Sequence, residues 1–366
     1  MSQALRGAPS HAICAGRRPA GRRVGGVYRP RRRGRQRPFL SPDRSGARPA
    51  AWEPKVVSPL HPHSPASHDI ATLWWWMLVV AGIVFLGAVA MLLVGWFRRG
   101  TPGLPFFGES ERANTGLVIA FGIAIPLVVL IALFIVSDLY VLNKTDAPEV
   151  SSTALTVTVV GHQWWWEARY PAGGVVTANE IHIPARTPVN LVARSVDVIH
   201  SFWVPELNRK IDMIPGQSNR IELYAEEPGV YRGQCAEFCG LQHAHMAFEV
   251  HAEPRRDFER WLSANGRPAH RATGALARQG QRYFMEDGCA ACHTIAGTGA
   301  EGTVGPSLTH LAGRETIAAD TLPNTPADLF RWIQNPQSVK PGAKMPGLGL
   351  GPRKFHAIVA YLTELE

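Results

Sequence analysis

Two cysteines, a histidine and a methionine that could bind a metal lie within the twelve residues from Cys235 to Met246. The segment reads Cys-Ala-Glu-Phe-Cys-Gly-Leu-Gln-His-Ala-His-Met. Thiolate and thioether sulfur favour copper over hard cations, and imidazole also suits copper. Because the spacers are short, one loop can present all of these ligands to one centre. The sequence therefore predicts a copper site.

A second imidazole has to come from another part of the chain. The candidate is His200, which ends the apolar stretch Val196-Asp197-Val198-Ile199-His200. Copper sites of the cupredoxin type usually draw one histidine from a strand remote from the cysteine loop. Two alternatives remain open at this point, a disulfide between Cys235 and Cys239 and a tetrahedral zinc site. Neither of them explains Met246.

The segment Cys289-Ala290-Ala291-Cys292-His293 forms a second motif. Its spacing is typical of c-type haem attachment, with two thioether links from Cys289 and Cys292 and with His293 as an iron ligand. Met345 follows about fifty residues later and is the expected distal ligand. A zinc knuckle and a redox Cys-x-x-Cys pair are the alternatives. The histidine that follows the second cysteine favours haem.

The copper loop resembles the dinuclear copper (CuA) loop of subunit II of the haem-copper oxidases. The spacing Cys-x-Glu-x-Cys-x-x-x-His-x-x-Met is complete, and His200 lies at the family's distance upstream. The resemblance implies that Cys235 and Cys239 bridge both coppers, and that His200 and His243 bind one copper each. It implies a weak axial role for Met246.

The same resemblance assigns roles to Glu237 and Trp164. Glu237 would give its backbone carbonyl to copper and its side chain to a magnesium ion at the boundary with subunit I. Trp164, in the run Gly161-His162-Gln163-Trp164-Trp165-Trp166, matches the family's electron-entry tryptophan. Three adjacent tryptophans on one strand would alternate between its faces. Ordinary packing is therefore the alternative for Trp166.

Two apolar runs, Leu73 to Phe97 and Leu117 to Ser137, contain no charged residue. Each is long enough to cross about 30 Å of hydrocarbon, although a buried core helix is the alternative. The linker between the runs carries Arg98, Arg99 and Arg112, which places it on the cytoplasmic side. Everything after the second run then lies outside.

The first 65 residues contain fourteen Arg or Lys and two acidic residues. They are rich in Pro, Gly and Ala and lack interleaved aromatic residues, so we predict disorder rather than nucleic-acid binding. They also lack the apolar core of a signal peptide. The positive-inside rule would keep this arm in the cytoplasm, which conflicts with the predicted hairpin. Removal of the arm, a later start or dedicated export would resolve the conflict.

The predicted fold class is a multi-domain membrane protein. Short β-branched segments at 155–160, 180–183, 189–192 and 220–224 indicate a cupredoxin-like Greek-key β-sandwich. The predicted parts are an Arg/Pro/Gly-rich disordered arm (1–67), a two-helix transmembrane hairpin (68–141), a cupredoxin CuA domain (142–265) and an all-α class I cytochrome c domain (266–366).

The resemblance covers residues 68–366 and implies subunit II of a cytochrome c oxidase with a fused cytochrome c. The chain would lie in the bacterial inner membrane, in contact with lipid, with both soluble domains on the periplasmic or outer face. Electrons would pass from a donor, such as a soluble or membrane cytochrome c or a cytochrome bc complex, through haem c and CuA to subunit I, which reduces oxygen. Subunit III would be a further partner.

Two other functions compete with this interpretation. The equivalent subunit of a CuA-containing nitric oxide reductase differs in the catalytic subunit rather than in this chain. A membrane-tethered copper-delivery protein is the third hypothesis, but delivery needs no haem.

Residues 142–265 hold 11 basic and 15 acidic side chains, and residues 266–366 hold 10 and 8. The opposite but small net charges predict that the two soluble domains dock loosely near Trp164. The linker at residues 265–274 would then supply a high effective concentration.

Overall fold

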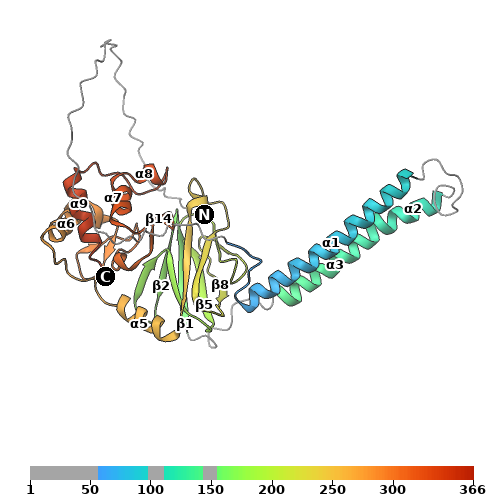
Figure 1. Cartoon of the computed structure of the whole chain (residues 1–366), viewed down its shortest axis with the longest axis horizontal. Helices are drawn as coiled ribbons and strands as arrows, with labels where there is room; N and C mark the ends of the chain where they lie inside the picture. The colour runs from blue at the N-terminus through green and yellow to red at the C-terminus, as the bar shows by residue number, and fades with distance from the viewer. Residues whose placement is uncertain (1–56, 98–110, 143–154) are drawn as a thin grey trace, which may run out of the picture. The chain divides into compact units, whose positions relative to one another are not determined.

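The computed structural model describes residues 57–97, 111–142 and 155–366 (Figure 1). Most of the predicted N-terminal arm lies outside the described residues, and so do Arg98 and Arg99. The described parts form a helical hairpin, a β-sandwich (residues 155–253) and a C-terminal domain (residues 266–366).

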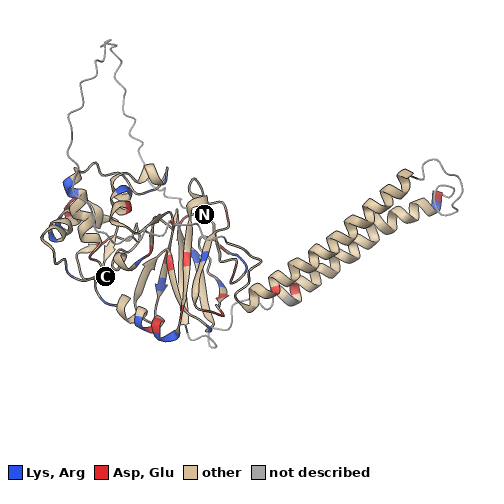
Figure 2. Ribbon diagram, viewed as in Figure 1, with Lys and Arg blue, Asp and Glu red and all other residues tan. Residues whose placement is uncertain are grey.

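The hairpin consists of α1 (Pro65–Phe97) and of a second arm made from α2 (Glu111–Ile119), η1 (Ala120–Ala124), α3 (Ile125–Ser137) and η2 (Asp138–Leu142). Both arms are long and apolar enough to cross a membrane, and the protein buries the apolar stretch of neither arm. Charged residues occur only near the ends of the two arms (Figure 2). These arms match the two predicted spans.

The structure departs from the predicted hairpin in two local features. Helix α1 begins before the apolar run, because the Ser64 hydroxyl accepts a hydrogen bond from the Ser67 N–H at 3.1 Å and so caps the helix start. In the second arm, η1 is a π-helical turn just before Pro126. Proline lacks the N–H that an α-helical hydrogen bond needs, which explains the widened turn.

The β-sandwich consists of two five-stranded sheets, in the orders β3-β2-β1-β5-β8 and β4-β10-β9-β6-β7. The strands are β1 (Leu155–His162), β2 (Trp165–Tyr170), β3 (Val175–Ala178), β4 (Glu180–Pro184), β5 (Val189–Ser195), β6 (His200–Trp203), β7 (Ile211–Met213), β8 (Asn219–Leu223), β9 (Gly229–Cys235) and β10 (Ala247–Glu253). The four predicted strands correspond to β1, β4, β5 and β8. The pairs β1/β5 and β4/β10 are parallel, so the chain crosses between the two sheets instead of running only through hairpins.

The sequence suggested that the three adjacent tryptophans lie on one strand, but the structure shows that they do not. Strand β1 ends at His162 and β2 begins at Trp165, so Trp164 lies in the turn between them. Trp166 is fully buried, and its ring contacts Phe202 and Phe248. The alternative that Trp166 is a core residue is therefore confirmed.

The C-terminal domain is mainly helical. Its elements are α6 (Ala275–Glu286), η5 (Cys289–Ala291), β11 (Thr294–Ile295), β12 (Ala300–Glu301), η6 (Leu311–Gly313), β13 (Thr316–Ile317), β14 (Leu322–Pro323), α7 (Pro326–Gln334), α8 (Pro336–Val339) and α9 (Pro352–Leu362). Helix α5 (Arg255–Asn265) precedes the linker. Helices α6 and α9 cross at Gly280, where a Cβ atom would lie 1.8 Å from the Ala357 carbonyl oxygen.

Gly280→Ala should therefore destabilise the C-terminal domain by about 1–3 kcal/mol, because the two helices must move apart to admit the methyl group. Thermal unfolding of the purified chain, followed by circular dichroism, measures the loss. Gly313→Ala is the matched control, since nothing lies within 4 Å of a Cβ atom there. Equal stability of the two variants would show that the helix crossing tolerates a side chain.

Candidate functional site

Two neighbouring strands bring the predicted metal ligands together. Strand β6 begins at His200 and β9 ends at Cys235, and the antiparallel register places Phe202 opposite Cys235. The same register, continued, places His200 opposite Glu237, and the Ala236 N–H donates to the Ser201 carbonyl at 2.9 Å. The remaining ligand candidates lie in the loop that connects β9 to β10. The remote histidine and the cysteine loop therefore meet at one end of the sheet.

The sulfur and nitrogen atoms lie at the separations expected of ligands that share metal ions. Cys235 Sγ is 3.7 Å from Cys239 Sγ, and Cys239 Sγ is 3.7 Å from Met246 Sδ. His200 Nδ1 is 3.9 Å from Cys235 Sγ, and His243 Nδ1 is 3.7 Å from Cys239 Sγ. Ligand bonds of about 2.0–2.3 Å in a tetrahedral arrangement give ligand separations of about 3.3–3.8 Å. The donor set therefore fits bound metal.

The two cysteines do not form a disulfide. Their sulfur separation of 3.7 Å far exceeds the S–S bond length of about 2.05 Å. A hydrogen bond from the Cys239 thiol lowers the pKa of Cys235, and His200 lowers it further, against the effect of burial. The neighbouring thiolate raises the pKa of Cys239. A positive charge between the sulfurs would favour ionisation of both cysteines.

Asp197 orients His200, and the sequence analysis missed this role. Its Oδ1 lies 2.8 Å from His200 Nε2, which leaves Nδ1 facing the sulfurs. Burial alone would raise the pKa of Asp197, but hydrogen bonds from His200 and from the Val198 and Gln163 N–H groups hold it at about 2. Metal-binding histidines usually donate their other N–H to a carboxylate or carbonyl. An acid three residues before a candidate histidine was therefore an available signal.

Gly161 and Trp166 shape the space around the site. A Cβ atom on Gly161 would lie 2.8 Å from the His200 ring, so only glycine lets the ring approach β1. The Trp166 indole N–H donates to the Met246 carbonyl at 3.3 Å. Because both Trp166 and His200 are fully buried, this side of the site excludes water.

The predicted roles of Glu237 and Trp164 fall on residues that contact the site. The Glu237 carbonyl oxygen is 3.2 Å from Cys235 Sγ. The Trp164 indole N–H donates to the Cys239 carbonyl at 3.0 Å, and its ring lies against Gly240, where a Cβ atom would be 3.0 Å away. The turn between β1 and β2 therefore packs directly on the cysteine loop.

In the C-terminal domain, the chain fixes His293 in the form that can bind iron. Its Nδ1 lies 2.8 Å from the Pro306 carbonyl oxygen, which leaves Nε2 for a metal. Burial lowers the pKa of His293, so the imidazole stays neutral at pH 7. A Cβ atom on Gly305 would lie 2.6 Å from the ring, so the loop packs closely against it.

The other haem candidates border the same core. Cys289 and Met345 both pack against the cluster of buried residues that includes Phe284 and Phe355. Cys292 follows η5 and is half-buried, and both cysteines are free thiols. These residues fit covalent haem attachment, since the thiols and the oriented imidazole lie beside one apolar core.

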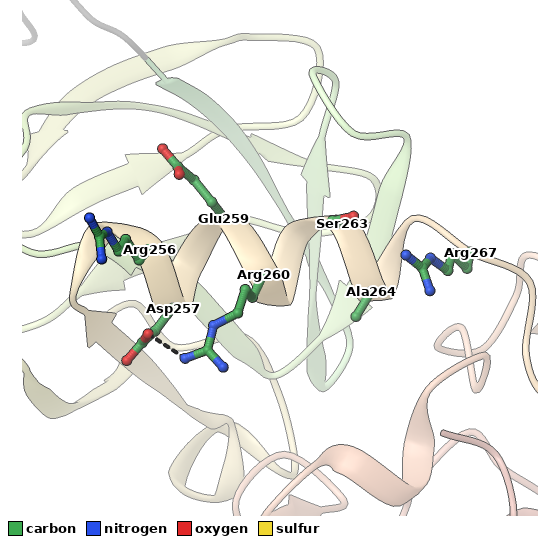
Figure 3. A pocket seen from close by; sticks show the side chains of 7 residues that line it. All are labelled: Arg256, Asp257, Glu259, Arg260, Ser263, Ala264 and Arg267. Atoms are coloured by element: carbon green, nitrogen blue, oxygen red, sulfur yellow. Dashed lines mark hydrogen bonds and ion pairs between the residues drawn. The ribbon is translucent and has the colours of Figure 1, made fainter.

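A surface hollow of about 840 Å³ lies along α5 and offers no competing copper site (Figure 3). Its lining is charged or small, and the Arg260 side chain donates to Asp257 at 2.5 Å. The seven lining residues are Arg256, Asp257, Glu259, Arg260, Ser263, Ala264 and Arg267. None of them carries sulfur or imidazole.

Comparison with known proteins agrees with both the copper candidates of the β-sandwich and the haem candidates of the C-terminal domain. Residues 174–253 match the family "Cytochrome C oxidase subunit II, periplasmic domain", and residues 277–366 match the family "Cytochrome c". Cytochrome c oxidase subunit 2 of Alkalihalophilus pseudofirmus is 35% identical over 294 residues, which cover 79% of this chain and 84% of that protein. The chain belongs to the cytochrome c oxidase subunit II family. Subunit 2 of Bacillus subtilis is 29% identical over 306 residues, 79% of this chain and 86% of that protein.

Among solved structures, the periplasmic domain of subunit II of Bradyrhizobium japonicum cytochrome oxidase is 29% identical. The match covers 31% of this chain and 94% of the chain in that structure, with a TM-score of 0.30.

Family membership confirms the predicted fold class and the assignment as a subunit of cytochrome c oxidase. This subunit II is membrane-anchored and has periplasmic domains. Its two matched domains imply CuA and haem c, and an electron-transfer role follows from the family.

Asp197→Asn should leave every candidate copper ligand in place but weaken copper binding by about 10–100-fold, because the neutral amide orients and polarises His200 less well. Copper transfer to a chelator of known affinity measures this change. Asp257→Asn, on the exposed face of α5, is the control. Unchanged copper affinity in Asp197→Asn would contradict the orienting role.

Proposed function

We propose that this subunit II relays electrons from an external donor, through a haem c and a dinuclear copper centre of its own, to subunit I for the reduction of oxygen to water. The observation that carries the proposal is the buried pair of sulfur atoms of Cys235 and Cys239, 3.7 Å apart, with one imidazole on each side. A dinuclear copper centre held by these residues would supply one-electron transfer with little change in bond lengths.

The proposed ligand roles follow from which atom approaches which sulfur. Cys235 and Cys239 would hold both coppers, and His200 and His243 would each bind one of them. This assignment is supported because the two imidazoles face different sulfur atoms. His200 Nδ1 faces Cys235 Sγ, and His243 Nδ1 faces Cys239 Sγ. Met246 would be the weak ligand, because its sulfur is an uncharged thioether and lies 3.7 Å from Cys239 Sγ. A single tetrahedral zinc would leave one of these five donors unused.

Glu237 has two proposed functions. Its carbonyl oxygen, which approaches Cys235 Sγ, would bind copper. Its half-buried carboxylate binds a magnesium ion shared with subunit I, since carboxylate oxygen is a preferred magnesium ligand.

The haem is held by Cys289, Cys292, His293 and Met345. The two thiols would form the covalent links, and His293 and Met345 would bind the iron. The hydrogen bond from His293 to Pro306 supports this assignment because it fixes the ring with Nε2 free. A Met/His pair raises the iron potential, as a relay that feeds an oxidase requires.

We place electron entry to the copper site at Trp164, whose indole N–H bonds to the Cys239 carbonyl. The proposed location is the bacterial inner membrane, with both ends of the hairpin outside. Partners are subunits I and III, and the donor is a soluble or membrane cytochrome c or a cytochrome bc complex.

Cys235→Ser should abolish the dinuclear site, because a hydroxyl cannot replace a bridging thiolate. Metal analysis and the purple absorbance of the purified chain both measure this loss. Cys14→Ser, which removes a cysteine outside both motifs, is the control and should change neither measurement. Met246→Leu should keep the copper but shift its potential, because the thioether tunes a site that the thiolates and imidazoles hold. Full copper content and absorbance in Cys235→Ser would refute the ligand assignment.

Met345→Ala should keep the haem covalently attached but remove the weak sulfur–iron absorption band and lower the haem potential, because an axial thioether raises that potential. Visible spectroscopy and a redox titration check both effects. Met285→Ala is the matched control, as Met285 is the other methionine of the C-terminal domain. An unchanged spectrum in Met345→Ala would identify a different distal ligand.

A further inference from the structure

Lys340 is a buried lysine that joins the C-terminal domain to the β-sandwich. Only 3% of its surface is exposed, and its Nζ donates to the carbonyl oxygens of Trp164 at 3.2 Å, His245 at 2.8 Å and Ala318 at 3.0 Å. Two of these acceptors belong to the β-sandwich. One is in the turn that packs on Cys239, and the other is in the loop that contains the copper ligand candidates.

The surroundings of Lys340 match the hydrogen-bonding capacity of an ammonium group. Burial of a charge is costly unless its donors are satisfied, and an ammonium has three donors. Three carbonyl oxygens supply one acceptor for each donor. Burial lowers the pKa of Lys340 to about 7, and the nearby charge of Cys239 acts against this shift. The binding of the Lys340 ammonium therefore depends on where these three carbonyl oxygens lie and not on a carboxylate partner.

The residues that follow Lys340 extend the same contact. The Gln242 side-chain amide donates to the Pro341 carbonyl at 2.6 Å. Gly342 has a φ of +87°, and a Cβ atom there would lie 2.8 Å from Leu241 Cδ1. The chain between Lys340 and Met345 thus lies against the copper loop along its first residues.

A second contact holds the turn that supplies the Ala318 carbonyl. Ala318, Ala319 and Asp320 all have φ between 56° and 58°, a conformation that is costly for residues other than glycine. Asp320 is 2% exposed at its side chain and accepts a hydrogen bond from Arg232 of β9 at 2.6 Å. Contacts with the β-sandwich therefore help to hold this turn in its unusual conformation.

A third contact lies beside that turn. The Glu180 carboxylate of β4 accepts hydrogen bonds from the N–H groups of Glu315 at 2.8 Å and Thr316 at 3.1 Å. These two backbone donors belong to the C-terminal domain, and their acceptor belongs to the β-sandwich. They can therefore report on whether the two domains are in contact.

We propose that Lys340 is the positioning residue that fixes the C-terminal domain on the β-sandwich in one orientation, with the Met345 loop beside Trp164. The inference rests on the proposed electron relay and names the contact that orients it. Hydrogen bonds run from Lys340 to Trp164, and from Trp164 to Cys239. The segment that carries the proposed distal haem ligand is thereby connected to a proposed bridging cysteine.

This contact differs from the loose, weakly charged docking that the net charges predicted. Buried contacts carry it, namely the donors of Lys340 and the ion pair of Asp320 with Arg232, and an ion pair of Lys344 with Asp197 at 3.6 Å adds to them. The net charges failed as a guide because the acceptors of Lys340 are backbone carbonyls, which do not contribute to a domain's charge. The expected position of the contact, near Trp164, agrees with the structure.

Chemical labelling of the unmodified, cofactor-loaded chain tests the docking directly. Under brief acetylation, Lys340 should remain unmodified while Lys344 and Lys354, whose side chains are 58% and 39% exposed, react. Mass spectrometry locates the modified lysines. Acetylation of Lys340 as fast as Lys344 would overturn the proposal, whether or not the copper site carries electrons.

Lys340→Met then tests whether this residue sets the orientation. Loss of a charge-assisted hydrogen bond should raise the exchange rate of the Glu315 and Thr316 amide hydrogens by about tenfold or more. Lys354→Met makes the same change where the lysine pairs with Asp287 within its own domain, and should leave this exchange unchanged.

A purely local role for Lys340 would not alter amides that donate to Glu180 across the interface. With copper and haem spectra intact, Lys340→Met should also slow electron transfer from haem to copper. Unchanged exchange at Glu315 and Thr316 would overturn the proposal. If the variant fails to fold, the acetylation of the unmodified chain still decides it.

Discussion

The structure depends on holding two ionisable sulfur atoms 3.7 Å apart in a buried position. Two thiolates at that distance repel each other, so the arrangement suits bound cations. Several local features serve this one constraint. Strand β9 ends at Cys235 beside the start of β6, and the Cys235 N–H donates to the Met246 carbonyl at 3.0 Å, which closes the ligand loop. Asp197 then orients the imidazole that comes from β6.

The contact between the soluble domains is also built around a buried ionisable group, the ammonium of Lys340. Trp164 contacts Cys239, and His245 lies in the loop that contains both cysteines. The backbone carbonyls of Trp164 and His245 accept hydrogen bonds from Lys340. Backbone acceptors cannot be titrated or exchanged by substitution, and the ammonium they bind is hidden from salt. The proposed orientation is thus set next to the proposed site of electron entry. The linker at residues 265–274 needs only to keep the two domains near each other.

How much the sequence could predict depended on whether the information was local. The ligand loop and the haem motif were predictable because their residues lie within short segments of fixed spacing, and the long apolar runs predicted the hairpin. The position of Trp164 in a turn was not predictable, because strand ends depend on pairing with other strands. Lys340 gave no signal, since a lysine beside proline and glycine normally lies in solvent. Its acceptors become neighbours only after both domains have folded.

The central claim is that both thiolates are shared between two coppers. Electron paramagnetic resonance of the oxidised, copper-loaded chain tests it most directly, because copper nuclei split the signal of an unpaired electron. The account predicts a hyperfine pattern from one electron spread over two equivalent copper nuclei. A pattern from a single copper nucleus, in a sample whose copper sites are fully occupied, would contradict it.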